Sequence, residues 1–202
     1  MKYLTICFSL FCAIYTTAQT YEDSIIELRV VQMGEMVDSS KHILKQDEID
    51  HFEGLAFFKV EPAYRINTKF TRSIGKKFEM PTTTDRKPIY RRYGYVDFQL
   101  DGKEYRLTVF QNMALKKQKE YKKYLFIPFR DLTSGKETYG GGRYLDTEIP
   151  SGDVLILDFN RAYNPYCAYS HRYSCPIPPE ENTLKVAIRA GEKVPVGFDL
   201  QH

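Results

Sequence analysis

Residues 90–111 read YRRYGYVDFQLDGKEYRLTVFQ, and this stretch decides the fold. Aromatic and β-branched side chains, which favour strands, are frequent on both sides of the Asp101-Gly102 dipeptide. Asp-Gly between two such runs is a strong signal for a two-residue turn. The stretch therefore predicts an antiparallel β-hairpin.

Similar runs lie on both sides of this hairpin. Residues 64–70 alternate between apolar and polar side chains, as a half-buried strand does. YLFIPF at 124–129 and DVLILDF at 153–159 are continuous apolar runs typical of central strands, and LKVAI at 184–188 closes the pattern. We therefore expect a mainly β fold, a single antiparallel barrel-like or sandwich domain of about seven or eight strands.

The start of the chain follows a helical pattern instead. Residues 20–36 carry apolar side chains at helical spacing with charged residues between them, which predicts an amphipathic helix. A second short helix is expected over residues 47–52, before Gly54. This N-terminal segment is expected to pack over an open end or edge of the sheet.

Residues 1–18 have the layout of a secretory signal. Lys2 supplies a positive start, residues 4–15 are almost wholly apolar, and residues 16–18 are small. The apolar stretch is too short for a spanning helix, and no later stretch is longer, so no membrane span is expected.

Removal of this leader also removes Cys7 and Cys12. Bulky residues precede both cysteines, which argues against a lipoprotein signal. We expect residues 1–18 to be a signal peptide and residues 19–202 to form the single β-rich domain, exported to the periplasm or outside the cell.

The charge balance argues against nucleic acid as a partner. The formal net charge is +3, and loss of Lys2 with the leader leaves +2, whereas a nucleic-acid-binding protein needs a strongly basic face. One basic run, at residues 116–123, is compatible with a polyanion or membrane surface, but a solvated hairpin end explains it better. The oligomeric state is not predicted.

Cys167 and Cys175 are the two cysteines of the expected mature chain. In an oxidising compartment a pair with this short spacing is expected to form a disulfide, stabilising the fold by about 2–3 kcal/mol. The alternative is a Cys167 nucleophile with His171 as its base. The spacing lacks the paired ligands of structural zinc, so no metal is expected.

Residues 140–143 read GGGR and form the first candidate site segment. Consecutive glycines let backbone N–H groups approach a ligand, and Arg143 can grip a carboxylate or phosphate. Glu137 and Tyr139 lie just upstream. The segment matches no phosphate-loop or dinucleotide fingerprint, so no cofactor is expected. The structural alternative is a tight crossover in which Arg143 pairs internally with a carboxylate such as Asp131.

Residues 158–165, DFNRAYNP, form the second segment. Asp158 follows an apolar strand, where a carboxylate is costly unless it is paired or functional. It is a candidate acid or base, or the partner of an arginine such as Arg161. Asn160 and Asn164 are candidate ligand-binding residues, or they hold the following loop through backbone hydrogen bonds.

Residues 167–182 form the third segment, rich in Tyr and Pro. A loop of this composition suits a lid over a planar or sugar-like ligand. The structural alternative is a stiff loop that seals the mouth of the barrel.

These segments carry a family resemblance. Residues 126–146 and 157–193 closely resemble the bacterial domain-of-unknown-function family 1684, and residues 52–66 and 88–111 are similar to its N-terminal half. The resemblance covers nearly all of residues 19–202, and DFNRAYNPYC is its most specific string. It implies no known activity and supplies no catalytic residues.

Three hypotheses of function follow. The first is a binding protein that takes a small polar or anionic ligand in a pocket built from the 129–182 loops. The second is a hydrolase that uses Asp158 or Glu137 as acid or base, with Arg143 stabilising an oxyanion. The third is a structural module in which the same residues form an internal polar network. We expect the binding protein. Its candidate ligand-binding residues are Arg143, Tyr139, Asn160, Arg161 and Asn164.

Overall fold

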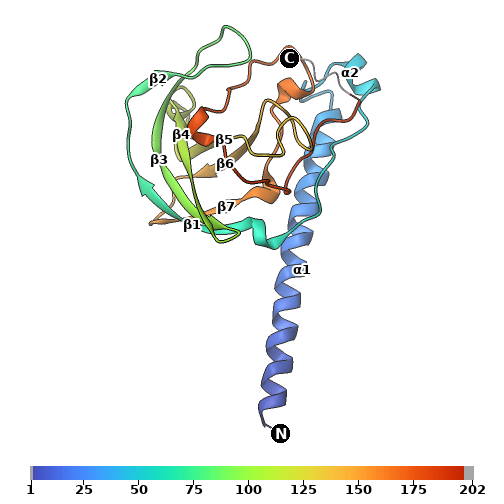
Figure 1. The fold of residues 1–202 in the computed structure, drawn as a ribbon. Helices are drawn as coiled ribbons and strands as arrows, with labels where there is room; N and C mark the ends of the chain where they lie inside the picture. The colour runs from blue at the N-terminus through green and yellow to red at the C-terminus, as the bar shows by residue number, and fades with distance from the viewer. Residues whose placement is uncertain (1, 198–202) are drawn as a thin grey trace.

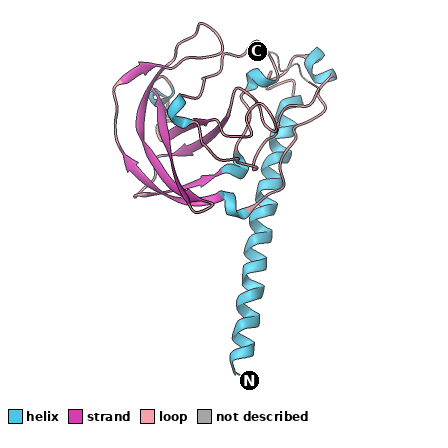
Figure 2. Ribbon diagram, in the orientation of Figure 1, coloured by secondary structure: helices cyan, strands magenta, loops and turns pink. Residues whose placement is uncertain are grey.

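The computed structural model describes the backbone of residues 2–197 and the side chains of residues 20–197. One antiparallel sheet of seven strands, curled into a half-barrel, dominates the fold (Figures 1 and 2). Its main path runs β6-β5-β4-β3-β1-β7, and β2 pairs with β3 beside that path. The strands are β1 (Arg65–Arg72), β2 (Lys77–Glu79), β3 (Ile89–Leu100), β4 (Lys103–Asn112), β5 (Tyr124–Phe129), β6 (Arg143–Glu148) and β7 (Val154–Asp158). The predicted mainly β, barrel-like fold is confirmed.

The β3–β4 hairpin forms as the sequence predicts. Leu100 pairs with Lys103, and the turn residues Asp101 and Gly102 both have positive φ angles, of 51° and 72°. This backbone matches the twist of the two strands, which is why Asp-Gly suits the turn.

The N-terminal helix α1 (Lys2–Val37) runs past the domain (Figure 1). Its C-terminal part packs beside the domain with Ile25 and Met36 buried, which confirms the helix expected over residues 20–36. The second helix, α2 (Gln46–Asp50), is also confirmed. Among the described residues, no helix is long and apolar enough to cross a membrane. Short 3₁₀ turns are η1 (Pro62–Tyr64), η2 (Leu115–Lys117), η3 (Phe159–Arg161), η4 (Tyr166–Ala168) and η5 (Glu180–Asn182).

The concave face of the sheet is filled by the C-terminal segment, which Figure 1 shows crossing it as an irregular chain. Leu184, Ile188 and Ala190 are buried in the main core with the inward side chains of the sheet. The strand predicted over residues 184–188 is wrong. The apolar side chains there are buried, but the backbone joins no strand and makes scattered hydrogen bonds instead, to Arg130 and Leu132 of one loop and to the side chains of Asp131 and Arg143.

Strand β6 was not predicted, because three glycines and an arginine interrupt the apolar pattern before it. It pairs with β5 along its whole length, from Arg143 to Glu148. Gly142 makes the sharp entry into this strand possible. It has a φ of +92°, and a Cβ there would lie 2.6 Å from the carbonyl oxygen of Phe129.

Candidate functional site

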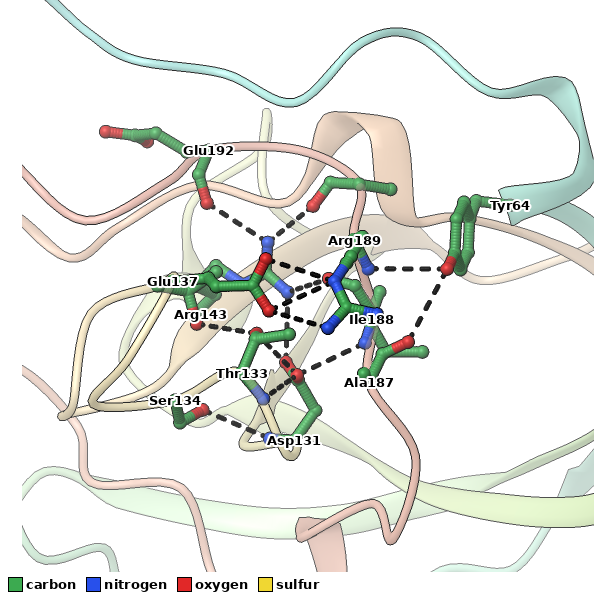
Figure 3. Close-up of polar contacts among 12 residues, drawn as sticks. Tyr64, Asp131, Thr133, Ser134, Glu137, Arg143, Ala187, Ile188, Arg189 and Glu192 are labelled. Atoms are coloured by element: carbon green, nitrogen blue, oxygen red, sulfur yellow. Dashed lines mark hydrogen bonds and ion pairs between the residues drawn. The ribbon is translucent and has the colours of Figure 1, made fainter.

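Arg143 lies in the interior of the protein and is only 1% exposed. Its guanidinium donates to the Asp131 carboxylate at 2.9 Å and to the carbonyl oxygens of Ile188 at 2.8 Å and Glu192 at 3.1 Å (Figure 3). It also donates to the carbonyl oxygen of Ala190. Burial lowers the pKa of Arg143, and the Asp131 charge opposes that shift.

Asp131 is equally enclosed and saturated with donors. Its carboxylate accepts from the backbone N–H of Thr133 at 2.8 Å, from the Thr133 hydroxyl at 2.6 Å, and from the N–H of Ile188 at 3.2 Å. The Arg143–Asp131 ion pair thus ties the C-terminal segment to β6. Protein groups surround the Arg143 guanidinium, which favours the internal alternative, and its ligand-binding role stays a prediction. This part of the molecule matches the internal-network hypothesis.

Glu137 has a solvent-exposed side chain and lies close to this cluster (Figure 3). Its carboxylate pairs with Arg189, whose Nε donates to both oxygens at 3.0 Å. The hydrogen bond from Arg189 lowers the pKa of Glu137. A lowered pKa and an exposed setting do not suit the acid or base role that the hydrolase hypothesis gave to Glu137.

Asn160 is buried and clamps a neighbouring segment. Its Oδ1 accepts from the N–H of Glu61 at 2.9 Å, and its Nδ2 donates to the carbonyl oxygen of Glu61 at 2.8 Å and to the Tyr21 hydroxyl at 3.0 Å. The amide is therefore fully used inside the fold. These contacts give Asn160 a structural role, with Glu61 as the partner in place of the following loop that the alternative named; its ligand-binding role stays a prediction.

Asp158 lies at the end of β7 and is held by protein donors. The Tyr21 hydroxyl donates to it at 2.8 Å, and Arg65 lies 4.0 Å away. Within residues 20–197, no hydrogen bond or ion pair joins Asp158 to Glu137 or Arg143. Within the described residues, Arg143 pairs with Asp131 and contacts neither Asp158 nor Glu137, the two carboxylates that the hydrolase hypothesis offers as acid or base.

A cleft of about 630 Å³ separates the two edge strands, β6 and β7. Tyr144 and Tyr163 close one end of this cleft by exchanging two backbone hydrogen bonds, of 2.9 and 3.1 Å. Beyond this bridge, Asp146, Asp158 and the exposed Arg161 line the cleft. Two of the predicted site residues, Asp158 and Arg161, thus reach the same hollow.

Asp146 occupies a central position in the cleft between β6 and β7. Its carboxylate accepts from the hydroxyl of Tyr124 at 2.7 Å and from that of Tyr163 at 2.9 and 3.0 Å. The surrounding protein raises the pKa of Asp146 by desolvation, while the two tyrosine hydroxyls and Arg161 oppose that shift. Asp146 also lines a second hollow, so that its carboxylate lies between two cavities.

This second hollow, which we name the acceptor cavity, has a volume of about 240 Å³. The helix α1, β6 and the loop that follows β7 contribute its walls. Its polar lining residues are Gln32, Glu35, Asp146, Tyr163, Asn164, Tyr166, Tyr169 and Glu192, and its apolar ones are Met36, Ile43 and Leu55.

Asn164 and Glu192 form the buried wall of the acceptor cavity. The backbone N–H of Asn164 donates to Glu192 Oε2 at 2.8 Å, and its Nδ2 donates to Oε1 at 3.0 Å and to the Lys193 carbonyl oxygen at 2.7 Å. The Tyr169 hydroxyl also contacts the Glu192 carboxyl. Burial raises the pKa of Glu192 to about 8. Among the described residues, Asn164 Oδ1 is buried and accepts no hydrogen bond.

Tyr139 belongs to a third hollow, beside the cysteines. Its hydroxyl lies 4.0 Å from the Sγ of Cys167. Cys167 and Cys175 are neighbours, but both are free thiols, and the N–H of Cys167 donates to the Sγ of Cys175 at 3.3 Å. The disulfide therefore stays a prediction, although the fold brings its two residues together. No group of His, Cys, Asp and Glu suited to a metal ion occurs within the described part of the chain.

Sequence reasoning missed Asp146, Glu192 and Arg130, the last of which lines the hollow beside the cysteines. Asp146 had a weak local signal, a carboxylate in an alternating segment after GGGR. Glu192 had none, because its burial depends on contacts with residues 28 positions away.

Residues 50–193 match the model of DUF1684, described as a protein of unknown function. The chain belongs to the DUF1684 family. The match to the family model covers all seven strands and Glu192 and excludes α1, which supplies one wall of the acceptor cavity.

A solved structure also resembles this DUF1684 chain. It is the solution NMR structure of an uncharacterized protein of Haloarcula marismortui, with 33% identity and a TM-score of 0.67 over 93% of this chain and 99% of the other. Comparison with curated proteins gives no match.

Proposed function

We propose that this protein binds a small polar ligand, neutral or cationic, in the acceptor cavity. The observation that carries the proposal is one group of the wall: Asn164 Oδ1 is a buried hydrogen-bond acceptor and has no donor among the described residues. An unpaired buried acceptor is costly, so a ligand that supplies an N–H or O–H group is favoured there.

The charges along the cavity favour the same ligand class. Asp146 contributes a carboxylate, Glu35 contributes another that pairs with Lys41 at 3.4 Å, and within residues 20–197 no Lys or Arg itself lines the cavity. Glu192, with its pKa raised to about 8 by burial, is mostly neutral at pH 7. An amine or a polyol fits this field, whereas an anion would be repelled. The proposal thus keeps the polar ligand that the sequence predicts. For this cavity it favours a neutral or cationic ligand over an anionic one.

The size and the walls of the cavity limit the ligand further. A volume of about 240 Å³ lies just below the usual range for drug-sized ligands, about 300–1,000 Å³. Tyr163, Tyr166 and Tyr169 offer ring faces and hydroxyls, while Met36 and Ile43 offer an apolar side. A compact amine or polyol with a small apolar part therefore suits the site.

The test is calorimetric titration of the full chain with small amines, polyols and carboxylates. Asp146→Asn removes the shared carboxylate while its amide oxygen still accepts from Tyr124 and Tyr163. Glu148→Gln is the matched control, because Glu148 lies two residues along β6 and lines the cleft but not the cavity.

We expect an amine or polyol to bind the wild type and Glu148→Gln alike. Asp146→Asn should weaken the binding of an amine by about tenfold or more, the effect of losing one charge-assisted hydrogen bond. A ligand at about 100 times its dissociation constant also stabilises the fold by about 2.7 kcal/mol, which a thermal-shift assay detects. Selective binding of carboxylates, or equal weakening by both variants, would contradict the proposal.

We also propose that the chain is exported to the periplasm or outside the cell, with residues 1–18 removed as a signal peptide. The positive start, the apolar run and the small residues of the leader support this. So does Figure 1, in which the N-terminal part of α1 extends away from the sheet. Intact mass of the protein secreted from a bacterial host tests it, and a mass that still includes the leader would count against export.

A further inference from the structure

We propose that Cys167 and Cys175 form a redox-active pair that exchanges with a small, negatively charged disulfide in the cavity beside Arg130. This cavity, which we name the thiol cavity, has a volume of about 310 Å³ and is separate from the acceptor cavity. Its lining includes Arg130, Tyr139, Gly140, Gly141, Tyr144 and Cys167.

The two thiols are held together by segments that are anchored independently. Cys167 lies in η4, where the N–H groups of the next residues bond back to Pro165 and Tyr166. Cys175 exchanges two hydrogen bonds with Thr83: its carbonyl oxygen accepts from the Thr83 N–H at 2.9 Å, and its N–H donates to the Thr83 hydroxyl at 3.1 Å. The pair is therefore preorganised for a bond between the sulfur atoms.

The surroundings give the two thiols different roles. A hydrogen bond from the Cys175 thiol lowers the pKa of Cys167, burial opposes the shift, and the Tyr139 hydroxyl adds to it, while Cys167 is also the cysteine that lines the cavity. The same hydrogen bond and burial raise the pKa of Cys175. Because the thiolate is the nucleophile, Cys167 is the attacking group and Cys175 the resolving group.

The geometry selects a small substrate over a protein. Cys167 is 3% exposed and Cys175 is 7% exposed, so a disulfide on a protein surface cannot reach either sulfur. Cys167 lines the thiol cavity, and a low-molecular-weight disulfide can enter there. At Gly141 a side chain would collide with the Tyr139 ring, since a Cβ would lie 2.4 Å from it.

Arg130 determines the charge of the substrate. Among the described residues it is the single Lys or Arg that lines the thiol cavity, and no Asp or Glu lines it. A guanidinium in this position favours a substrate that carries a carboxylate. A disulfide of an acidic thiol, of the glutathione type, has both features.

The exchange balances in two steps. The Cys167 thiolate attacks one sulfur of the substrate disulfide RS–SR, forming Cys167–S–SR and releasing RS⁻. The Cys175 thiol then loses its proton to solvent and attacks the Sγ of Cys167, forming the Cys167–Cys175 disulfide and releasing a second RS⁻. The protein dithiol is oxidised by two electrons and the substrate disulfide is reduced to two thiols.

The test follows intact mass when the reduced full chain, carrying Cys7→Ser and Cys12→Ser, is mixed with oxidised glutathione. We expect this protein to lose two hydrogens and to release two molecules of reduced glutathione. Cys175→Ser should stop at one glutathionyl group on Cys167, while Cys167→Ser should form no internal disulfide. A thermal melt of each variant verifies that it is folded, and Cys167→Ala replaces Cys167→Ser if the latter does not fold.

Arg130→Gln tests the choice of substrate. It should slow the reaction with oxidised glutathione by about tenfold, the effect of one lost charge-assisted hydrogen bond, and leave the reaction with neutral 2-hydroxyethyl disulfide unchanged.

Three outcomes would overturn the proposal. The first is that the native thiols do not react under conditions in which the urea-unfolded chain does. The second is a disulfide that dithiothreitol cannot reduce in the native protein, which would make it purely structural. The third is that Arg130→Gln slows the reactions with both disulfides equally, which would show that the charge of Arg130 does not select the substrate.

Discussion

Arg143 and Asp146 lie three residues apart on β6, yet they belong to two different kinds of region. Arg143 is buried among a carboxylate and three carbonyl oxygens, all contributed by the protein. Asp146, on the opposite face of the strand, accepts from two tyrosines and lines two hollows. One strand, β6, thus supplies a residue to an enclosed structural cluster and a residue to an open site.

The difference shows that a charged residue in a glycine-rich motif is not in itself a sign of ligand binding. What separates the two is where their partners come from. The hydrogen bonds of the Arg143 guanidinium are all made to protein groups; its Nε is buried without an acceptor among the described residues, but Arg143 lines neither of the two hollows. Among the described residues, the wall of the acceptor cavity has an unpaired acceptor and no Lys or Arg, so a ligand can complete it.

The largest expected effect is on the closed cluster. Asp131→Ala leaves the Arg143 guanidinium buried without its counter-charge, which typically costs about 3–5 kcal/mol. Urea unfolding of the variant measures the loss. The double variant Asp131→Ala/Arg143→Met should lose less than the sum of the two single losses. Additive losses would mean that the ion pair is not coupled.

The next effect concerns the wall of the acceptor cavity. The pKa of Glu192 is raised by burial to about 8. At pH values between the ordinary pKa of a glutamate and about 8, Glu192 therefore holds a proton in the folded protein that it has lost in the unfolded chain. This contribution to stability is complete at low pH and is lost as the pH rises, by about 1.4 kcal/mol per pH unit within that window.

Glu192→Gln keeps the neutral shape and cannot titrate. Unfolding free energies of the wild type and this variant between pH 5 and pH 8 should therefore diverge, with the wild type losing stability relative to the variant as the pH rises. A constant difference across this range would show that Glu192 is already ionised at pH 5.

A smaller effect is expected for the clamp at Asn160. Asn160→Ala leaves the backbone N–H and carbonyl of Glu61 without their buried partner, a loss of about 1–3 kcal/mol. Thermal unfolding measures it. Ligand binding at the acceptor cavity should not change, and weaker binding with an intact fold would move Asn160 from the structural group to the site.

The smallest effect is expected at the surface pair. Glu137→Gln breaks the contact with Arg189, but both side chains are solvent-exposed, and pairs of this kind contribute little. Thermal melts of the variant and the wild type should coincide. A clear drop in melting temperature would show that the surface pair supports the Arg143 cluster beneath it.

The sequence predicted most strands because their signals are local. The Asp-Gly turn and the apolar runs of β3, β4, β5 and β7 are each contained in a few residues. Strand β6 was missed because its position depends on pairing with β5. Residues 184–188 were correctly expected to be buried, but an apolar run does not distinguish a strand from an irregular segment that fills the core.

The candidate site was predictable only in part, for the same reason. Arg161 and Asn164 were identified from their segment, and both line hollows in the structure. Whether a polar group is satisfied depends on distant partners, however. Asp146 meets Tyr124 across 22 positions, and Arg143 meets Ile188 across 45, and no local pattern reports either contact.

The most direct test of the account is a comparison of Arg143→Met and Asp146→Asn, with both unfolding free energy and ligand binding measured for each. The account predicts opposite outcomes. Arg143→Met should lose several kcal/mol of stability, because it strands the Asp131 charge, while its remaining folded fraction binds as the wild type does. Asp146→Asn should unfold close to the wild type and lose binding. An Arg143→Met protein of normal stability that fails to bind, or an Asp146→Asn protein that binds normally, would contradict it.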